Sequence, residues 1–195
     1  HILGVLTVVA AFVVGLLIFV QTAGLPAADR TREQSVYDWI SVGGLHVDFG
    51  LRLDPLSLTF VLLITGVGGL IHIYAVGYMS HDPGRRRFFA QFNLFVAAML
   101  VLVLANNFVL LYLGWEGVGL ASYLLIGFYQ DRPSAATAAK KAFLMNRVGD
   151  VGLAIAIFIL WTQLGTLQYT EVFANIGRVD PGALVAITVL LLLGA

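Results

Sequence analysis

Three charged residues lie within apolar stretches that are otherwise typical of membrane-spanning helices. Glu116 lies inside "LYLGWEGVGLASYLLIGFY", residues 111–129, and Arg147 and Asp150 lie inside the next apolar stretch. An ionised side chain at the centre of a bilayer costs about 2.5–3.5 kcal/mol on insertion scales. Such a group is expected to face protein or water, to be paired or to be neutral. It is therefore a candidate for proton or ion transfer.

The spacing of these residues predicts how they meet. Arg147 stands three residues before Asp150, so the two share a helix face and can pair. Within one turn of Glu116 on its own helix, Tyr112 can at most form a hydrogen bond with it. Glu116 therefore needs a charged partner from another helix, or it is protonated. At about 1.5 Å per residue, Glu116 lies roughly 14 Å and Asp150 roughly 20 Å into their helices. Both acids therefore lie near the middle of their helices. Because a short loop joins the two helices, we expect the helices to be antiparallel neighbours and the two acids to lie at similar depth.

These charges also have structural interpretations. For Arg147 and Asp150, a bond that only holds helices together and a proton relay both remain open. For Glu116 the functional interpretation is favoured, because a single acid without a partner is poorly suited to holding helices together. Lys140 and Lys141 lie about 5 Å into their helix, so their long side chains can reach the interface as anchors.

A histidine adds a further candidate. His72 lies late in the apolar stretch 55–79, and a packed or capped histidine is the simpler interpretation for it. A role as a secondary relay is the alternative.

Composition supports a membrane protein. Hydrophobic residues make up 59% of the chain and charged residues 11%, against about 25% charged in soluble domains. The formal net charge of zero gives no electrostatic argument for nucleic acid. The chain has no cysteine, which excludes disulfides and thiolate metal sites.

Apolar stretches near 20 residues predict an all-α, polytopic transmembrane helix bundle. The expected spans are 2–20, 55–79, 88–105, 107–129 and 137–161, with an incomplete one at 182–195. Residues 25–35 are predicted as loop, and β-type residues around Gly43-Gly44 predict a short hairpin near 37–53. Pro55 fits the first turn of the helix that follows. Residues 162–181 are predicted as a second long loop.

The ends of the chain and its basic residues complete this outline. His1 and Ala195 both stand at the ends of apolar runs, so we expect residues 1–195 to be a single membrane domain that is a fragment of a longer polypeptide. Basic residues are densest in 80–87 and 130–141, which predicts the cytoplasmic side for these loops. Asn106-Asn107 is predicted as a simple turn between helices.

The blocks "FFAQFNLFVAAMLVLVLANNFVLLYLGWEGVGLASYLLIGFY" and "AAKKAFLMNRVGDVGLAIAIF" closely resemble the antiporter-like subunit L family of bacterial respiratory complex I, NADH:quinone oxidoreductase. "DPLSLTFVLLITGVGGLIHIYAVGYM" matches as well, so the resemblance covers nearly the whole chain from about Tyr37. It implies part of an antiporter-like fold of roughly 14–16 helices with inverted repeats and broken helices. The large subunit of a multisubunit Na⁺/H⁺ antiporter is the related second choice.

The resemblance also implies a function. The family is a non-redox, proton-translocating enzyme subunit of the bacterial inner (plasma) membrane, active in the respiratory chain and oxidative phosphorylation. It binds no cofactor or metal itself, and flavin mononucleotide, iron–sulfur clusters and quinone belong to partner subunits. The expected partners are other complex I membrane subunits, lipids, protons and water.

The resemblance also implies functional residues at the positions that match the family. Glu116 matches the membrane glutamate of the family, Asp150 and Arg147 match the acid and arginine of the next helix, and Lys141 matches a lysine at its cytoplasmic end. Lys140 remains a secondary candidate, as does the histidine described above. The central lysine of the family is expected on the helix that starts near 182, and residues 182–195 contain none.

These residues predict a mechanism and two rivals. Glu116 and the family's lysine would form a buried pair whose separation, driven by charge in an adjacent subunit, frees a proton. One rival is an Na⁺/H⁺ antiporter, which would not require NADH. The other is a structural scaffold, in which polar groups only fix helix packing.

Overall fold

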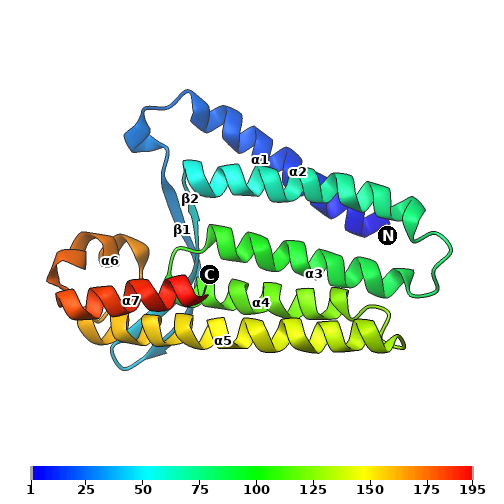
Figure 1. The fold of residues 1–195 in the computed structure, drawn as a ribbon. Helices are drawn as coiled ribbons and strands as arrows, with labels where there is room; N and C mark the ends of the chain where they lie inside the picture. The colour runs from blue at the N-terminus through cyan, green and yellow to red at the C-terminus, as the bar shows by residue number, and fades with distance from the viewer. Residues whose placement is uncertain (1, 195) are drawn as a thin grey trace.

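The computed structural model describes residues 2–194 as a bundle of helices with one β-hairpin (Figure 1). The main helices are α1 (Ile2–Ala23), α2 (Pro55–Tyr78), α3 (Arg85–Leu104), α4 (Phe108–Ile126), α5 (Pro133–Leu164) and α7 (Pro181–Gly194). Shorter elements are η1 (Ala27–Asp29), α6 (Tyr169–Asn175) and η2 (Ile176–Arg178). The predicted polytopic helix bundle with a small hairpin is confirmed.

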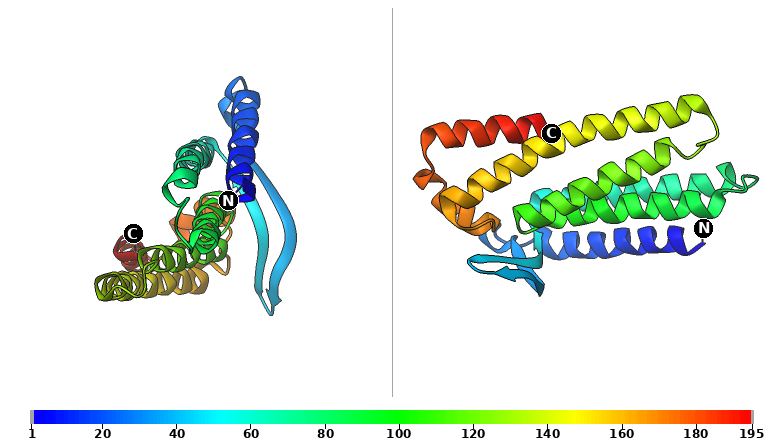
Figure 2. Two further views of the ribbon diagram at one scale, coloured as in Figure 1. Left: turned by 90° about the vertical axis from the view of Figure 1, so that its right-hand side faces the viewer. Right: turned by 90° about the horizontal axis from the view of Figure 1, so that it is seen from below.

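Five helices, α1 to α5, are long and apolar enough to cross a membrane. The chain is thus a multi-pass membrane protein. Successive helices run in opposite directions, and α1 packs on α2, α3 on α4, α4 on α5, and α5 on α7. Figure 2 shows α7 lying beside the second half of α5, so that α5 is covered on two sides. Whether residues 1–195 form a single domain stays a prediction.

The hairpin is longer than the sequence predicted. Strand β1 (Arg32–Val42) pairs antiparallel with β2 (Leu45–Leu53). Residues 32–35, predicted as loop, are strand, because they pair with the end of β2. Glu33 lies opposite Arg52, and their ion pair of 2.8 Å favours this extension. Gly43 in the turn has a φ of 59°, which suits a two-residue hairpin turn.

The predicted long loop 162–181 was also partly wrong. α5 continues to Leu164, and α6 and η2 follow it. α6 has only seven residues, too few for a hydropathy signal, and tertiary contacts stabilise it. Val172 is buried, and the ring of Tyr169 meets Phe108 edge-on at 4.8 Å between centroids.

Local capping sets where the helices begin. Asp54 caps α2 by accepting a hydrogen bond from Ser57 N at 2.8 Å, and Pro55 occupies the first turn as predicted. Asn107 caps α4 by accepting from Leu110 N at 2.8 Å. α2 and α4 both begin at the end of the bundle where the hairpin lies. The hairpin crosses these helix ends in Figure 1. By the predicted orientation this is the outer end.

Candidate functional site: an intramembrane charge cluster

Helices α4 and α5 bring the three intramembrane charges together. Glu116 is near the middle of α4, and Arg147 and Asp150 are near the middle of α5. The short connection between these helices makes them antiparallel neighbours, which gives the residues a similar depth. This is the arrangement that the spacing predicted.

Arg147 contacts both acids. Its Nη1 forms an ion pair with Oε2 of Glu116 and lies 3.4 Å from Oδ2 of Asp150. Glu116 thus has the partner on another helix that its position required. The guanidinium also lies over the ring of Phe143, 4.5 Å from the centroid, which favours a cation there.

The members of the cluster differ in burial. The side chain of Asp150 is 4% exposed, that of Glu116 is 23% exposed and that of Arg147 is 34% exposed. Among the described residues, Oδ2 of Asp150 and Nε of Arg147 have no hydrogen-bond partner. The cluster therefore retains hydrogen-bonding capacity that water or a further polar group can use.

A cavity of about 540 Å³ reaches Asp150 from between α3, α4, α5 and α7. Trp115 and Asn146 also line it, and the exposed Asn146 shows that it opens to the surface of the chain. This volume holds several water molecules. Neither residue was predicted from the sequence, although each stands next to a member of the cluster along the chain.

The remaining candidates lie outside the cluster. Lys140 and Lys141 are exposed near the start of α5, and no ion pair is found for either within residues 2–194. His72 is fully buried in α2, with Nδ1 2.7 Å from the carbonyl oxygen of Gly68 and its ring stacked on Phe92 at 4.0 Å. These contacts are those of a packed histidine.

A second polar network holds the hairpin against the end of the bundle at which α2 and α4 begin. The carboxylate of Asp48 accepts hydrogen bonds from Asn106, 3.1 Å from its Oδ2, and from Gln168. Asn107 donates to the carbonyl oxygen of Asp48 at 3.0 Å. Asn106 and Asn107 lie in the short connection between α3 and α4, as predicted, and their side chains also anchor β2, which the sequence did not indicate.

This network sets the acidity of Asp48. Burial alone would raise the pKa of Asp48, but the hydrogen bonds from Gln168, Ser35 and Asn106 outweigh burial. The pKa therefore lies below its ordinary value of 3.8, and the ionised form is favoured.

No group of three or more His, Asp or Glu side chains suited to a metal ion occurs in the part of the chain that the structure describes.

Two family models match the chain. "NADH-Ubiquinone oxidoreductase (complex I), chain 5 N-terminus" matches residues 39–89, and "NADH:quinone oxidoreductase/Mrp antiporter, TM" matches residues 105–195. NADH-quinone oxidoreductase subunit L of Mycobacterium tuberculosis is 58% identical over all 195 residues, which cover 31% of that protein. Subunit L of Escherichia coli is 57% identical over 143 residues, which are 73% of this chain and 23% of that protein. The chain thus spans about a third or less of these relatives.

Solved structures share the fold. A chain of the Mrp complex from Dietzia sp. has a TM-score of 0.74 at 26% identity, over 94% of this chain and 20% of that chain. A chain of an archaeal membrane-bound sulfane sulfur reductase has a TM-score of 0.78 at 15% identity, over 98% of this chain and 37% of that chain. The second likeness concerns the fold alone.

The fold and the matches define an antiporter-like membrane protein, of the class found in respiratory and Mrp complexes. Within this class, the chain belongs to the subunit L family of bacterial NADH-quinone oxidoreductase.

Proposed function

We propose that the chain is part of a non-redox, proton-translocating subunit of a bacterial NADH:quinone oxidoreductase in the plasma membrane. Quinone reduction elsewhere in the complex would drive proton transfer through this subunit. The names of the relatives support the assembly, and the intramembrane cluster supports the proton chemistry. Flavin, iron–sulfur clusters and quinone would reside in partner subunits.

The single observation that carries the proposal is one arginine shared by two acids. With all three groups ionised, the cluster of Glu116, Arg147 and Asp150 has a net charge of −1. An excess charge within a span is costly, and one added proton or one further cation would neutralise it. The cavity at Asp150 gives water a route to the cluster.

The cluster offers two states. When a proton binds one carboxylate, Arg147 keeps its ion pair with the other, so either acid can release its proton without leaving the arginine unpaired. A second cation brought close by a neighbouring helix or subunit would displace that proton. The lysine that the resemblance implies beyond this segment is suited to that role.

Other residues have secondary roles in the proposal. Lys141, and next to it Lys140, would raise the local positive potential at the cytoplasmic end of α5, where protons enter or leave. His72 would act only if water reaches its Nε2, which has no hydrogen-bond partner in the described part of the chain.

The test is Glu116→Gln in the assembled complex, with proton pumping and quinone reduction measured on the same vesicles. The amide keeps the shape of the side chain but cannot bind the proton. We expect fewer protons pumped per NADH oxidised. Glu171→Gln, which changes an exposed glutamate in α6, is the matched control and should leave the ratio unchanged. Full, coupled pumping in Glu116→Gln would reject the role assigned to it.

The Mrp complex structure favours one alternative, a large subunit of an Na⁺/H⁺ antiporter. Such a protein would exchange Na⁺ for protons without NADH and would purify with antiporter subunits rather than with quinone-reductase subunits. The 58% identity to subunit L along the whole chain favours the complex I assignment over the 26% identity to the Mrp chain. A structural scaffold would instead lose assembly in Glu116→Gln with no separate transport defect.

A further inference from the structure

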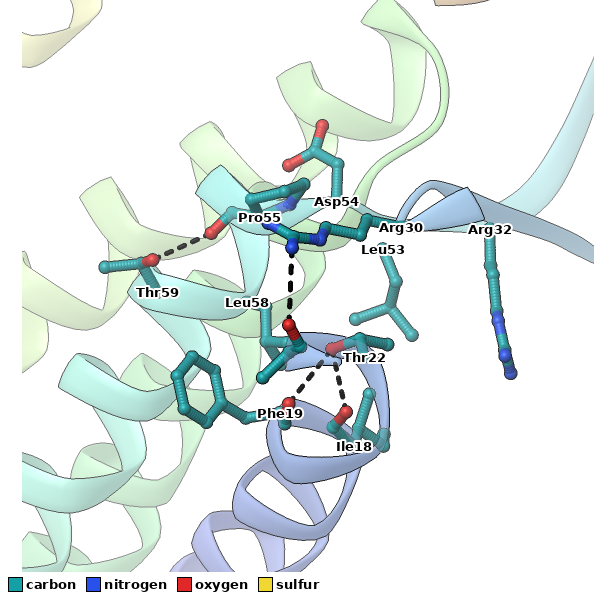
Figure 3. Close-up of a pocket in the computed structure, with 11 residues that line it drawn as sticks. Ile18, Phe19, Thr22, Arg30, Arg32, Leu53, Asp54, Pro55, Leu58 and Thr59 are labelled. Atoms are coloured by element: carbon teal, nitrogen blue, oxygen red, sulfur yellow. Dashed lines mark hydrogen bonds between the residues drawn. The ribbon is translucent and has the colours of Figure 1, made fainter. Parts of the chain in front are cut away.

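A cavity of about 130 Å³ lies at the outer ends of α1 and α2, far along the chain from the charge cluster. Figure 3 shows its lining. The inner wall is apolar and includes Ile18, Phe19 and Leu58. Arg30 and Arg32 also line it, at the start of the hairpin.

Arg30 is held in place by the end of α1. Its Nε donates to the carbonyl oxygen of Leu25 at 2.8 Å, and its Nη2 donates to that of Ala23 at 3.3 Å. A guanidinium carries five N–H donors, so these bonds leave others available. Arg30 makes no ion pair with any residue in 2–194.

Arg32 is unpaired as well. It is exposed at the first position of β1, and no hydrogen bond or ion pair is found for its side chain within the described chain. The nearby acids are engaged elsewhere, because Arg52 pairs with Glu33 at 2.8 Å and with Asp54 at 3.4 Å. In Figure 3 the carboxylate of Asp54 points away from the end of α1. Asp54 also lines the cavity, but its carboxylate pairs with Arg52, so Arg30 and Arg32 border the cavity without an ion-pair partner among the described residues.

The position of the cavity suits a phospholipid. α1 ends at Ala23 and α2 begins at Pro55, so the cavity lies where the apolar segments end and lipid headgroups begin. Below it, α1 exposes large apolar side chains, among them Leu16, Phe19 and Val20. Arginine binds phosphate oxygens through parallel N–H donors.

We propose that this cavity binds an anionic phospholipid. Its phosphate lies between Arg30 and Arg32, and an acyl chain lies along Phe19 and the exposed face of α1. Charge complementarity favours this occupant over an apolar protein segment, since Arg30 and Arg32 form no ion pair within the described residues and the acid in the lining, Asp54, pairs with Arg52. The lipid would fix the start of the hairpin to the end of α1.

The test uses the full-length protein in its assembled, delipidated complex. Bound lipid is counted by native mass spectrometry during titration with phosphatidylglycerol, phosphatidylcholine or inorganic phosphate. We expect Arg32→Gln to weaken binding of phosphatidylglycerol about tenfold, the usual effect of losing one charge-assisted hydrogen bond. Arg178→Gln, which changes another exposed arginine at the same end, is the control.

Arg30→Gln also removes the hydrogen bonds to the end of α1, so the Arg30→Gln variant can fail to fold. In that case Arg32→Gln alone carries the test. Unchanged phosphatidylglycerol binding in Arg32→Gln would overturn the proposal. Equal affinity for inorganic phosphate would identify an anion site without a lipid. Loss of a neighbouring subunit with unchanged lipid content would identify a protein occupant and equally overturn it.

Discussion

Replacing Arg147 with glutamine removes the cation that contacts both Glu116 and Asp150. At the 3.4 Å separation from Asp150, the attraction is about 5 kcal/mol for an effective dielectric constant near 20. Removing one partner of a fully buried pair costs about 3–5 kcal/mol. Arg147 and Glu116 are partly exposed, so solvent screens the remaining charges, and we expect a loss of about 2–3 kcal/mol.

A double-mutant cycle tests this reasoning. In the Arg147→Gln background, Glu116→Gln removes a carboxylate that has lost its partner, so the double variant should lose less stability than the sum. We expect a coupling of at least about 1 kcal/mol. The measurement is the free energy of unfolding of the full-length protein in mixed detergent micelles. Arg178→Gln should stay within about 0.5 kcal/mol of the parent. A coupling near zero, or an Arg147→Gln variant as stable as Arg178→Gln, would refute the shared ion pair.

Two further predictions concern packing and pH. A Cβ on Gly114 would lie 2.6 Å from the backbone of Leu102, so Gly114→Ala should force α3 and α4 apart and cost about 1–3 kcal/mol of unfolding free energy. Gly77→Ala, in open space on α2, is the control and should be neutral or slightly stabilising; equal effects would contradict the close contact. The pKa of Asp48 lies below 3.8 because its hydrogen bonds, one of them from Gln168, outweigh burial. Asp48 therefore stabilises the fold above its unfolded-state pKa, and this contribution is lost as the pH falls through its lower folded-state pKa. Melting curves of Asp48→Asn should show a weaker loss of stability below about pH 4 than the parent, and parallel curves would exclude Asp48 as the source.

Hydropathy predicted the main helices because a span needs about 20 apolar residues whatever its neighbours are. It underestimated α5, which begins at Pro133 and ends at Leu164, because the polar ends of a helix carry no hydropathy signal. It missed α6 for a related reason. A seven-residue helix depends on tertiary contacts, such as the burial of Val172, which no local pattern reports.

The charge cluster was only partly predictable. The spacing of Arg147 and Asp150 along one helix is enough to predict that they lie close together. The pairing of Arg147 with Glu116 depends on how α4 and α5 are rotated toward each other. α4 is apolar on nearly all sides, so its sequence does not indicate which face meets α5. The anchoring role of Asn106 and Asn107 could not be predicted either, because it depends on where the hairpin lies relative to the helices.

We propose above all that carboxyl groups in the Glu116–Arg147–Asp150 cluster bind and release protons during turnover. Infrared difference spectroscopy of the assembled complex, with and without NADH, reports protonated carboxyl groups directly. We expect a carboxyl signal that changes with turnover and is lost or altered in Glu116→Gln or Asp150→Asn, but not in Glu171→Gln. A signal that is identical in all three variants, with pumping intact, would contradict it.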